Sequence, residues 1–150
     1  EDDHGQMVDT IKLSNNAAKM STPGKHQVWR ITDRGSEKSE GDYVTLADED
    51  PRQLDSLYMF DPNYPFLNKT VEDFIARPLL KDIFVDGQQV YQEPSMNEIR
   101  QARQRHLDRL WEEYKRNLNP EVYPVDLSKK CYDNKMKIIK DVKDYIKHLN

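Results

Sequence analysis

The sequence predicts an α+β fold: a small antiparallel sheet with hairpins, followed by two C-terminal amphipathic helices packed on it. Three observations support this class. Short β-forming runs bounded by turn residues extend to Gln92, Asp86-Gly87 has the composition of a two-residue hairpin turn, and the last third carries apolar residues at helical spacing. Strands followed by helices, rather than alternating with them, are typical of α+β domains.

The first strands are expected within the first third of the chain. Gln6 to Ser14 has an imperfect strand-like alternation, with Met7, Asp9 and Ile11 on one face, and it follows a polar turn, but no partner strand precedes it in this sequence. Residues 27–32 and 43–46 flank a charged loop that contains glycine, and they predict an antiparallel pair. The unpartnered run at residues 6–14 indicates that the sequence begins inside a larger fold.

The middle of the chain contains one clear hairpin. Residues 48–69 include three prolines and are expected to form a loop, whereas residues 70–80 are consistent with either a strand or a short helix. Residues 82–92 place two apolar runs on either side of Asp86-Gly87, a pair that accepts the positive φ angles of a type I′ turn.

Two helices are expected in the last third. Ser95 and Glu98 form a capping-box pattern, which predicts a helix over residues 95–118 that ends at Asn119-Pro120. Trp111 lies on the apolar stripe of this helix and is therefore expected to be buried against the hairpin at Asp86-Gly87. A second stripe predicts a final helix carrying Cys131, Ile138, Val142, Tyr145, Ile146 and Leu149.

Composition limits both the core and the class of partner. The chain has 36% apolar and 33% charged residues, against about 45–50% and 25% in ordinary domains, so it is either a marginal domain or a peripheral piece of a larger body.

Its net charge of −4 argues against nucleic-acid binding. We expect no membrane segment, because no apolar run approaches the ~18 residues that one requires. A single cysteine and the lack of a signal-peptide pattern fit a cytoplasmic protein.

One basic, hydroxyl-rich stretch is a candidate phosphate-binding segment. Lys12, Ser14, Lys19 and Lys25 lie on or beside a loop between expected strands, and Arg30 follows them. Free backbone N–H groups around a glycine would add to such a site. The alternative is a solvated loop, which the spacing alone favours because it encodes no phosphate-loop motif.

Other candidate residues have simpler structural explanations. Trp111 and Tyr114 could stack on a ring but are more simply core residues of a helix. Cys131 has no neighbouring histidine signature and is expected to be buried. The acidic run 48–51 could hold Mg²⁺ or act as an acid–base pair, but a turn is the commoner meaning. The four histidines are dispersed, so we expect no metal site and no catalytic constellation.

An ordered set of short motifs resembles one enzyme family. None of these motifs is specific alone, but together they cover nearly the whole chain and resemble the C-terminal portion of bacterial nicotinate phosphoribosyltransferases. The motifs are Ile11-Lys12-Leu13-Ser14-Asn15-Asn16, Lys19, Thr22-Pro23-Gly24-Lys25, Glu40-Gly41-Asp42-Tyr43, Asp48-Glu49-Asp50-Pro51, Asp82-Ile83-Phe84-Val85-Asp86-Gly87, Pro94-Ser95, Trp111-Glu112-Glu113-Tyr114-Lys115-Arg116, Leu118-Asn119-Pro120 and Tyr123-Pro124-Val125-Asp126-Leu127-Ser128.

The resemblance implies that residues 1–150 are the C-terminal accessory domain of a larger barrel enzyme, with residues 1–32 as the tail of the preceding domain and the connection. Members of the family couple nicotinate to 5-phosphoribosyl-1-pyrophosphate and form nicotinate mononucleotide and pyrophosphate, the entry of nicotinate into NAD synthesis. ATP hydrolysis assists through a phosphohistidine, Mg²⁺ is required, and the enzymes are homodimers. The expected partner of this chain is therefore the missing N-terminal barrel domain.

No catalytic residue is carried over from the family, because its phosphorylated histidine and glycine-rich phosphate loop lie in the upstream barrel and no position here matches either motif. We expect the fragment itself to bind no cofactor. The segment from Lys12 to Lys25 follows closely after the phosphate loop in the family, which gives the supporting phosphate role equal weight with the solvated-loop interpretation.

A free-standing interaction module without catalytic activity is the alternative, with the helix at residues 95–118 as its binding face. The two hypotheses make different structural predictions. An enzyme fragment should show an orphan strand edge at its N-terminus and an exposed apolar patch, whereas a free-standing module should have a complete sheet.

Overall fold

The computed structural model describes residues 24–149, and residues 1–23 and 150 lie outside the described part. The strands are β1 (His26–Asp33), β2 (Ser39–Leu46), β3 (Ser56–Met59), β4 (Lys69–Glu72), β5 (Phe74–Pro78), β6 (Phe84–Val85), β7 (Gln88–Gln89) and β8 (Val125–Leu127). The helices are α1 (Met96–Asp108), α2 (Glu112–Lys115) and α3 (Lys129–His148), with 3₁₀ turns η2 (Pro51–Gln53) and η3 (Pro65–Leu67).

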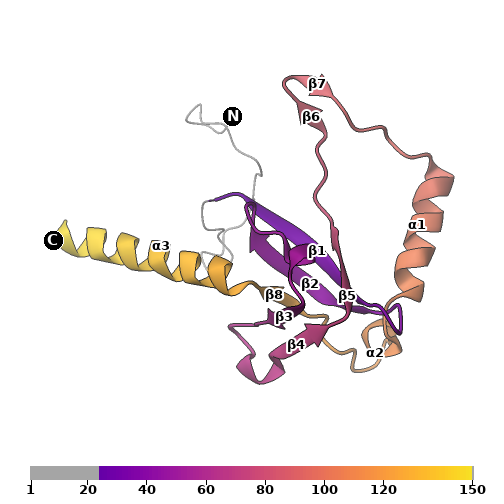
Figure 1. The fold of residues 1–150 in the computed structure, drawn as a ribbon, viewed down its shortest axis with the longest axis horizontal. Coiled ribbons are helices and arrows are strands. Elements are labelled where there is room, and N and C mark those ends of the chain that lie inside the picture. Colours follow the sequence, from indigo (N-terminus) through magenta and orange to yellow (C-terminus); the bar gives the residue numbers. More distant parts are fainter. Residues whose placement is uncertain (1–23, 150) are drawn as a thin grey trace.

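A four-stranded sheet in the order β5-β1-β2-β8 forms the centre of the molecule (Figure 1). β1 and β2 are antiparallel, with Val28 opposite Val44, which confirms the predicted pair. β5 continues the antiparallel pairing on the other side of β1, whereas β8 runs parallel to β2. The predicted assignment of residues 1–32 to the tail of a preceding domain and its connection stays a prediction. β1, which includes residue 32, pairs along nearly its whole length with β2.

The core lies between one face of this sheet and the β3–β4 hairpin. Alternate residues of β1 and β2 point into it, and Trp29 donates a hydrogen bond from Nε1 to Thr45 Oγ1 at 3.0 Å. Gly41 keeps the layers close, because a Cβ atom there would lie 3.0 Å from Met59 Cε. The buried cluster is small, as the composition predicts: Trp29, Ile31, Tyr43, Leu57, Met59, Val71, Phe74 and Ala76.

Two local sequence signals produce the structures expected of them. Asp86 and Gly87 have φ angles of 49° and 76°, as a type I′ turn requires, and they join β6 to β7. The capping box at the start of α1 is also confirmed, because Ser95 N–H donates to Glu98 Oε2 at 2.7 Å and Glu98 N–H donates to Ser95 Oγ at 3.3 Å.

The single helix predicted for residues 95–118 is wrong, because α1 ends at Asp108. The carbonyls that would extend it accept hydrogen bonds from the start of β2 and the residue before it: Lys38 Nζ donates to Asp108 O at 2.6 Å, and Ser39 N–H donates to Arg109 O at 2.8 Å. Trp111 then becomes the N-cap of α2. Its side chain is 38% exposed beside Lys38. The β6–β7 hairpin lies far from α2, at the top of Figure 1 where α2 is near the bottom. The predicted burial of Trp111 against the hairpin is therefore also wrong.

The α+β class is confirmed, but the helices do not cover the sheet as predicted. No residue of α1 is buried, and α3 buries only Cys131 in its first turn. Beyond that turn α3 extends away from the sheet (Figure 1), which leaves much of its apolar stripe exposed. No helix among the described residues is long and apolar enough to span a bilayer.

Residues 48–80 contain more strand than the sequence indicates. The expected loop holds β3, a four-residue strand in which only Leu57 and Met59 point inward, so its alternation is too short to detect. The ambiguous segment at residues 70–80 is resolved as strand, because it contains most of β4 and all of β5. The strand predicted at residues 6–14 lies outside the described residues.

Candidate functional site

The proposed phosphate-binding segment is described only at its end. Lys12, Ser14 and Lys19 lie outside the described residues, whereas Lys25 is exposed directly before β1, where its carbonyl accepts a hydrogen bond from Ala47 N–H at 3.0 Å. Arg30 is engaged elsewhere, in the sheet. A supporting phosphate role for this segment therefore stays a prediction.

The acidic run 48–51 is a turn, as predicted. Glu49 Oε2 accepts hydrogen bonds from Leu46 N–H and Ser128 Oγ, both at 2.7 Å, so it joins the end of β2 to the start of α3. Asp48 pairs with Lys130 at 2.6 Å, which lowers the pKa of the carboxyl group. Asp50 caps η2. Among the described residues, no cluster of histidine, cysteine and acidic side chains could hold a metal ion.

Cys131 is a structural residue, as the sequence predicts. The residue is 5% exposed, and burial raises the pKa of its thiol. Its backbone N–H donates to Ser128 Oγ at 3.0 Å as part of the N-terminal cap of α3. A raised pKa leaves little thiolate at neutral pH, so this thiol is unsuited to nucleophilic catalysis.

A polar network on the face of the sheet opposite the core holds α1 in place. Arg30 binds Asp42 through two hydrogen bonds of 3.0 and 3.2 Å, and Tyr123 Oη donates to the same carboxylate at 3.1 Å. Arg30 Nη1 lies 3.4 Å from His106 Nδ1 on α1. Burial, and then the neighbouring Asp42, raise the pKa of Tyr123 to about 12. The pKa of His106 is lowered by burial and then by Arg30 and other arginines.

The carboxylate and the phenol of this network are both engaged within it. Asp42, its one carboxylate, accepts bonds from both Arg30 and Tyr123, and the phenol remains protonated at physiological pH. Its residues come from β1, β2, α1 and the segment before β8, so sequence spacing gives no sign of it. Its role is to tie these elements together.

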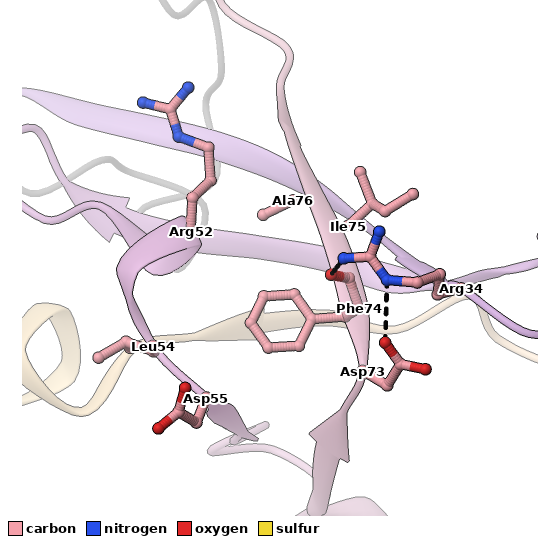
Figure 2. Close-up of a pocket in the computed structure, with 8 residues that line it drawn as sticks. All are labelled: Arg34, Arg52, Leu54, Asp55, Asp73, Phe74, Ile75 and Ala76. Carbon is pink, nitrogen blue, oxygen red and sulfur yellow. Dashed lines mark hydrogen bonds and ion pairs between the residues drawn. The ribbon is translucent and has the colours of Figure 1, made fainter.

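A hollow of about 470 Å³ lies beside β5, between that strand and the segment that follows η2 (Figure 2). The side chains of Phe74 and Ala76 project from β5 toward Leu54, which forms the opposite wall (Figure 2). Phe74 and Ala76 are largely buried by the core, whereas Leu54 is exposed. The floor of the hollow is therefore apolar.

Charged residues line the rim of the hollow, but its arginines are already paired. Arg34 Nε donates to Asp73 Oδ1 at 2.9 Å, and Arg34 Nη2 donates to Phe74 O at 3.1 Å (Figure 2). Arg52 pairs with Asp50 at 2.8 Å, and its guanidinium lies 5.1 Å from the centre of the Trp29 ring. The paired arginines make the hollow a poor anion site, and its apolar surface comes from Leu54, Phe74 and Ala76.

The corner before β5 is conformationally unusual. Asp73 has a φ angle of 47°, in the left-handed region that residues other than glycine rarely adopt. Its carbonyl accepts a hydrogen bond from Arg34 N–H at 3.1 Å, and its carboxylate holds the Arg34 guanidinium. Arg34 therefore fixes the corner that presents β5 and the hollow to solvent.

Large apolar side chains are widely exposed on the described part of the chain. Phe66, in the loop between β3 and β4, is 80% exposed, and the hairpin, α1 and α3 each expose several more. Such exposure is usual at surfaces that pack against another protein body. The examples include Tyr58, Leu67, Phe84, Val85, Met96, Ile99, Leu118, Val122, Val142, Tyr145, Ile146 and Leu149.

Comparisons with known proteins identify the family. The model of the nicotinate phosphoribosyltransferase C-terminal domain matches residues 25–135, so the chain belongs to this domain family. The chain is 46% identical over 145 residues to the nicotinate phosphoribosyltransferase of Bacillus subtilis (strain 168), a match covering 97% of this chain and 30% of that relative.

The fold leads to the same family. The crystal structure of human nicotinic acid phosphoribosyltransferase matches with a TM-score of 0.70 and 26% sequence identity, over 81% of this chain and 24% of that chain. The chain therefore spans less than a third of the length of either relative.

Proposed function

We propose that this chain is the C-terminal part of a bacterial, cytoplasmic nicotinate phosphoribosyltransferase. The observation that carries this proposal is the 46% identity to the Bacillus subtilis enzyme over nearly the whole chain. The whole enzyme would join nicotinate to 5-phosphoribosyl-1-pyrophosphate and form nicotinate mononucleotide and pyrophosphate, at the entry of nicotinate into NAD biosynthesis. It would be a glycosyltransferase coupled, as in ligases, to ATP hydrolysis.

Within that enzyme we propose a supporting role for this chain rather than a catalytic one. Its buried thiol and the carboxylates of the acidic turn are engaged in structural bonds. Phosphoribosyl transfer needs positioned cations and N–H donors around the phosphates. We propose that the larger part of the enzyme supplies these groups and binds Mg²⁺ and ATP. The basic segment at Lys12, Ser14, Lys19 and Lys25 would at most assist from nearby.

The partners follow from this role. We propose that the chain packs on the N-terminal barrel domain of the same polypeptide and that the whole enzyme is a homodimer, without nucleic-acid or membrane contacts. The exposed apolar side chains of α1, α3 and the β3–β4 loop support a chain that leans on a larger body. A free-standing module would have to keep these side chains in water.

A turnover assay tests the proposal. The whole transferase and the isolated 150-residue chain are each incubated with nicotinate, the phosphoribosyl donor, Mg²⁺ and ATP, and the mononucleotide is measured by chromatography. We expect product from the whole transferase and none from the isolated chain. A whole transferase that forms no mononucleotide would refute the proposed activity, and turnover by the isolated chain would refute its supporting role.

A further inference from the structure

The two edges of the four-stranded sheet are treated differently by the fold. At the β8 edge, Leu127 N–H donates to Phe60 O at 2.9 Å, and α3 begins directly afterwards, so this short edge is protected. At the β5 edge, no described strand pairs with the outer side of Phe74–Pro78. An open edge offers backbone donors and acceptors for another strand, and proteins usually cover or charge such edges.

The pairing with β1 determines which backbone groups of β5 face outward. Leu79 N–H donates to Val28 O at 2.8 Å, and Arg34 N–H donates to Asp73 O at 3.1 Å, so residues 73 and 79 are bonded to the β1 side. Because an antiparallel ladder alternates every second residue, Ile75 and Arg77 also face β1. The N–H groups of Phe74 and Ala76 therefore point away from the sheet, as does the carbonyl of Ala76.

The hollow lies along this same edge. Its floor is formed by the side chains of Phe74 and Ala76, and its far wall by Leu54 (Figure 2). A strand added to β5 would continue the sheet, and its side chains on the core face would enter the hollow at every second position. Backbone bonds and a side-chain pocket then coincide, which is the arrangement by which sheet edges bind extended segments.

We propose that the β5 edge docks an extended segment from the larger part of the transferase, which pairs with Phe74–Pro78 as a fifth strand and places an apolar side chain in the hollow. This inference rests on the proposed function. The chain spans only 30% of the Bacillus subtilis relative, so most of that polypeptide would lie outside it. A polypeptide fits better than a small anion, because both arginines of the rim are already paired. The groups that point outward from β5 are backbone N–H and carbonyl groups, which another strand can bind.

Hydrogen exchange read by mass spectrometry tests the docking. A peptic peptide covering residues 70–78 is compared between the isolated chain and the whole transferase. Ile75 and Arg77 are bonded to β1 in both samples, so only the Phe74 and Ala76 amides should gain protection. We expect the peptide from the whole transferase to carry two fewer deuterons at short labelling times. Equal labelling in the two samples would overturn the proposal.

Two variants separate edge pairing from general stability. Ala76→Pro removes an outward N–H without breaking the β1 ladder, a position where edge strands tolerate proline. Leu54→Asp places a charge on the wall of the hollow and leaves the backbone intact. In the whole transferase, each should return the Phe74 amide to the fast exchange of the isolated chain. Arg77→Gln is the control, because its side chain lies on the opposite face of the sheet, and it should leave that protection unchanged.

Four further outcomes of the same measurements are informative. Protection retained in both Ala76→Pro and Leu54→Asp would overturn the docking. Protection that appears in the isolated chain and grows with its concentration would assign the edge to a second copy and would also overturn it. Mononucleotide formation, measured on the same samples, keeps the two proposals apart: turnover without protection refutes only the docking, whereas protection without turnover supports the docking and refutes only the activity.

Discussion

Ile31→Ala should be among the most damaging single truncations in the sheet. Ile31 has no exposed surface, lies on β1 and belongs to the only buried apolar cluster of the described residues. Replacing a buried isoleucine by alanine costs about 2–5 kcal/mol, the higher values applying where neighbours cannot close the cavity. Leu57 and Met59 of the second layer are equally buried. Against a typical free energy of unfolding of about 5–15 kcal/mol, such a loss would leave a core this small close to unfolding.

Ile75→Ala provides the matched control. Ile75 lies on β5, where it pairs with Thr32 of β1. Its side chain is on the face of the sheet away from the core and is 41% exposed. The same atoms are removed from a side chain that remains largely in water, so we expect the free energy of unfolding to fall by less than about 1 kcal/mol. Urea titration followed by tryptophan fluorescence measures both variants, with buried Trp29 as the main reporter. Similar losses for both variants would refute the assignment of the core face.

Three further predictions concern a buried thiol, a histidine of α1 and the basic segment. Cys131 should react with a thiol reagent only at the rate of global unfolding, and rapid labelling of the native chain would contradict its burial. Folding lowers the pKa of His106. The contribution of this residue to stability is therefore present above its unfolded pKa and should be lost as the pH falls through the unfolded and then the folded pKa. An NMR titration of the imidazole that shows a raised pKa would contradict this. Alanine at Lys12, Lys19 and Lys25 should raise the KM of the whole transferase for the phosphoribosyl donor or ATP with little change in melting temperature, and unchanged kinetics would favour the solvated-loop interpretation.

Local signals account for the features that the sequence predicts correctly. The Asp86-Gly87 turn and the Ser95 capping box each depend on side chains within a few residues of the backbone they stabilise. The pairing of β1 with β2 is similarly local, because a short loop joins the two strands. The high charged fraction also predicts the small core, since few apolar side chains are available for burial.

Features that depend on distant residues are not visible in the sequence. The end of α1 is set by Lys38, just before β2, and by Ser39, the first residue of β2, which lie some seventy residues earlier and bind the carbonyls of Asp108 and Arg109. Helical periodicity continues past that point, so the pattern alone predicts one long helix. The exposed stripe of α3 has a related cause: amphipathicity indicates that a face is to be buried, but it does not identify what covers it.

The hollow at β5 could not be predicted for the same reason. Leu54 and Phe74 approach one another only because η2 folds back toward the sheet, and β5 is too short to give a distinct alternation. One signal was available: Asp73 separates two short β-forming runs, at a corner where the backbone takes a positive φ angle. By contrast, the basic segment that the sequence singles out lies mostly outside the described residues.

Complementation in trans tests the central claim most directly. The transferase is truncated before the region corresponding to this chain, and mononucleotide formation is measured with and without the purified 150-residue chain. If the chain supports a catalytic barrel without catalysing the reaction itself, the truncated enzyme should be nearly inactive, and adding the chain should restore turnover in a saturable way. A truncated enzyme that turns over as fast as the whole transferase would contradict the account.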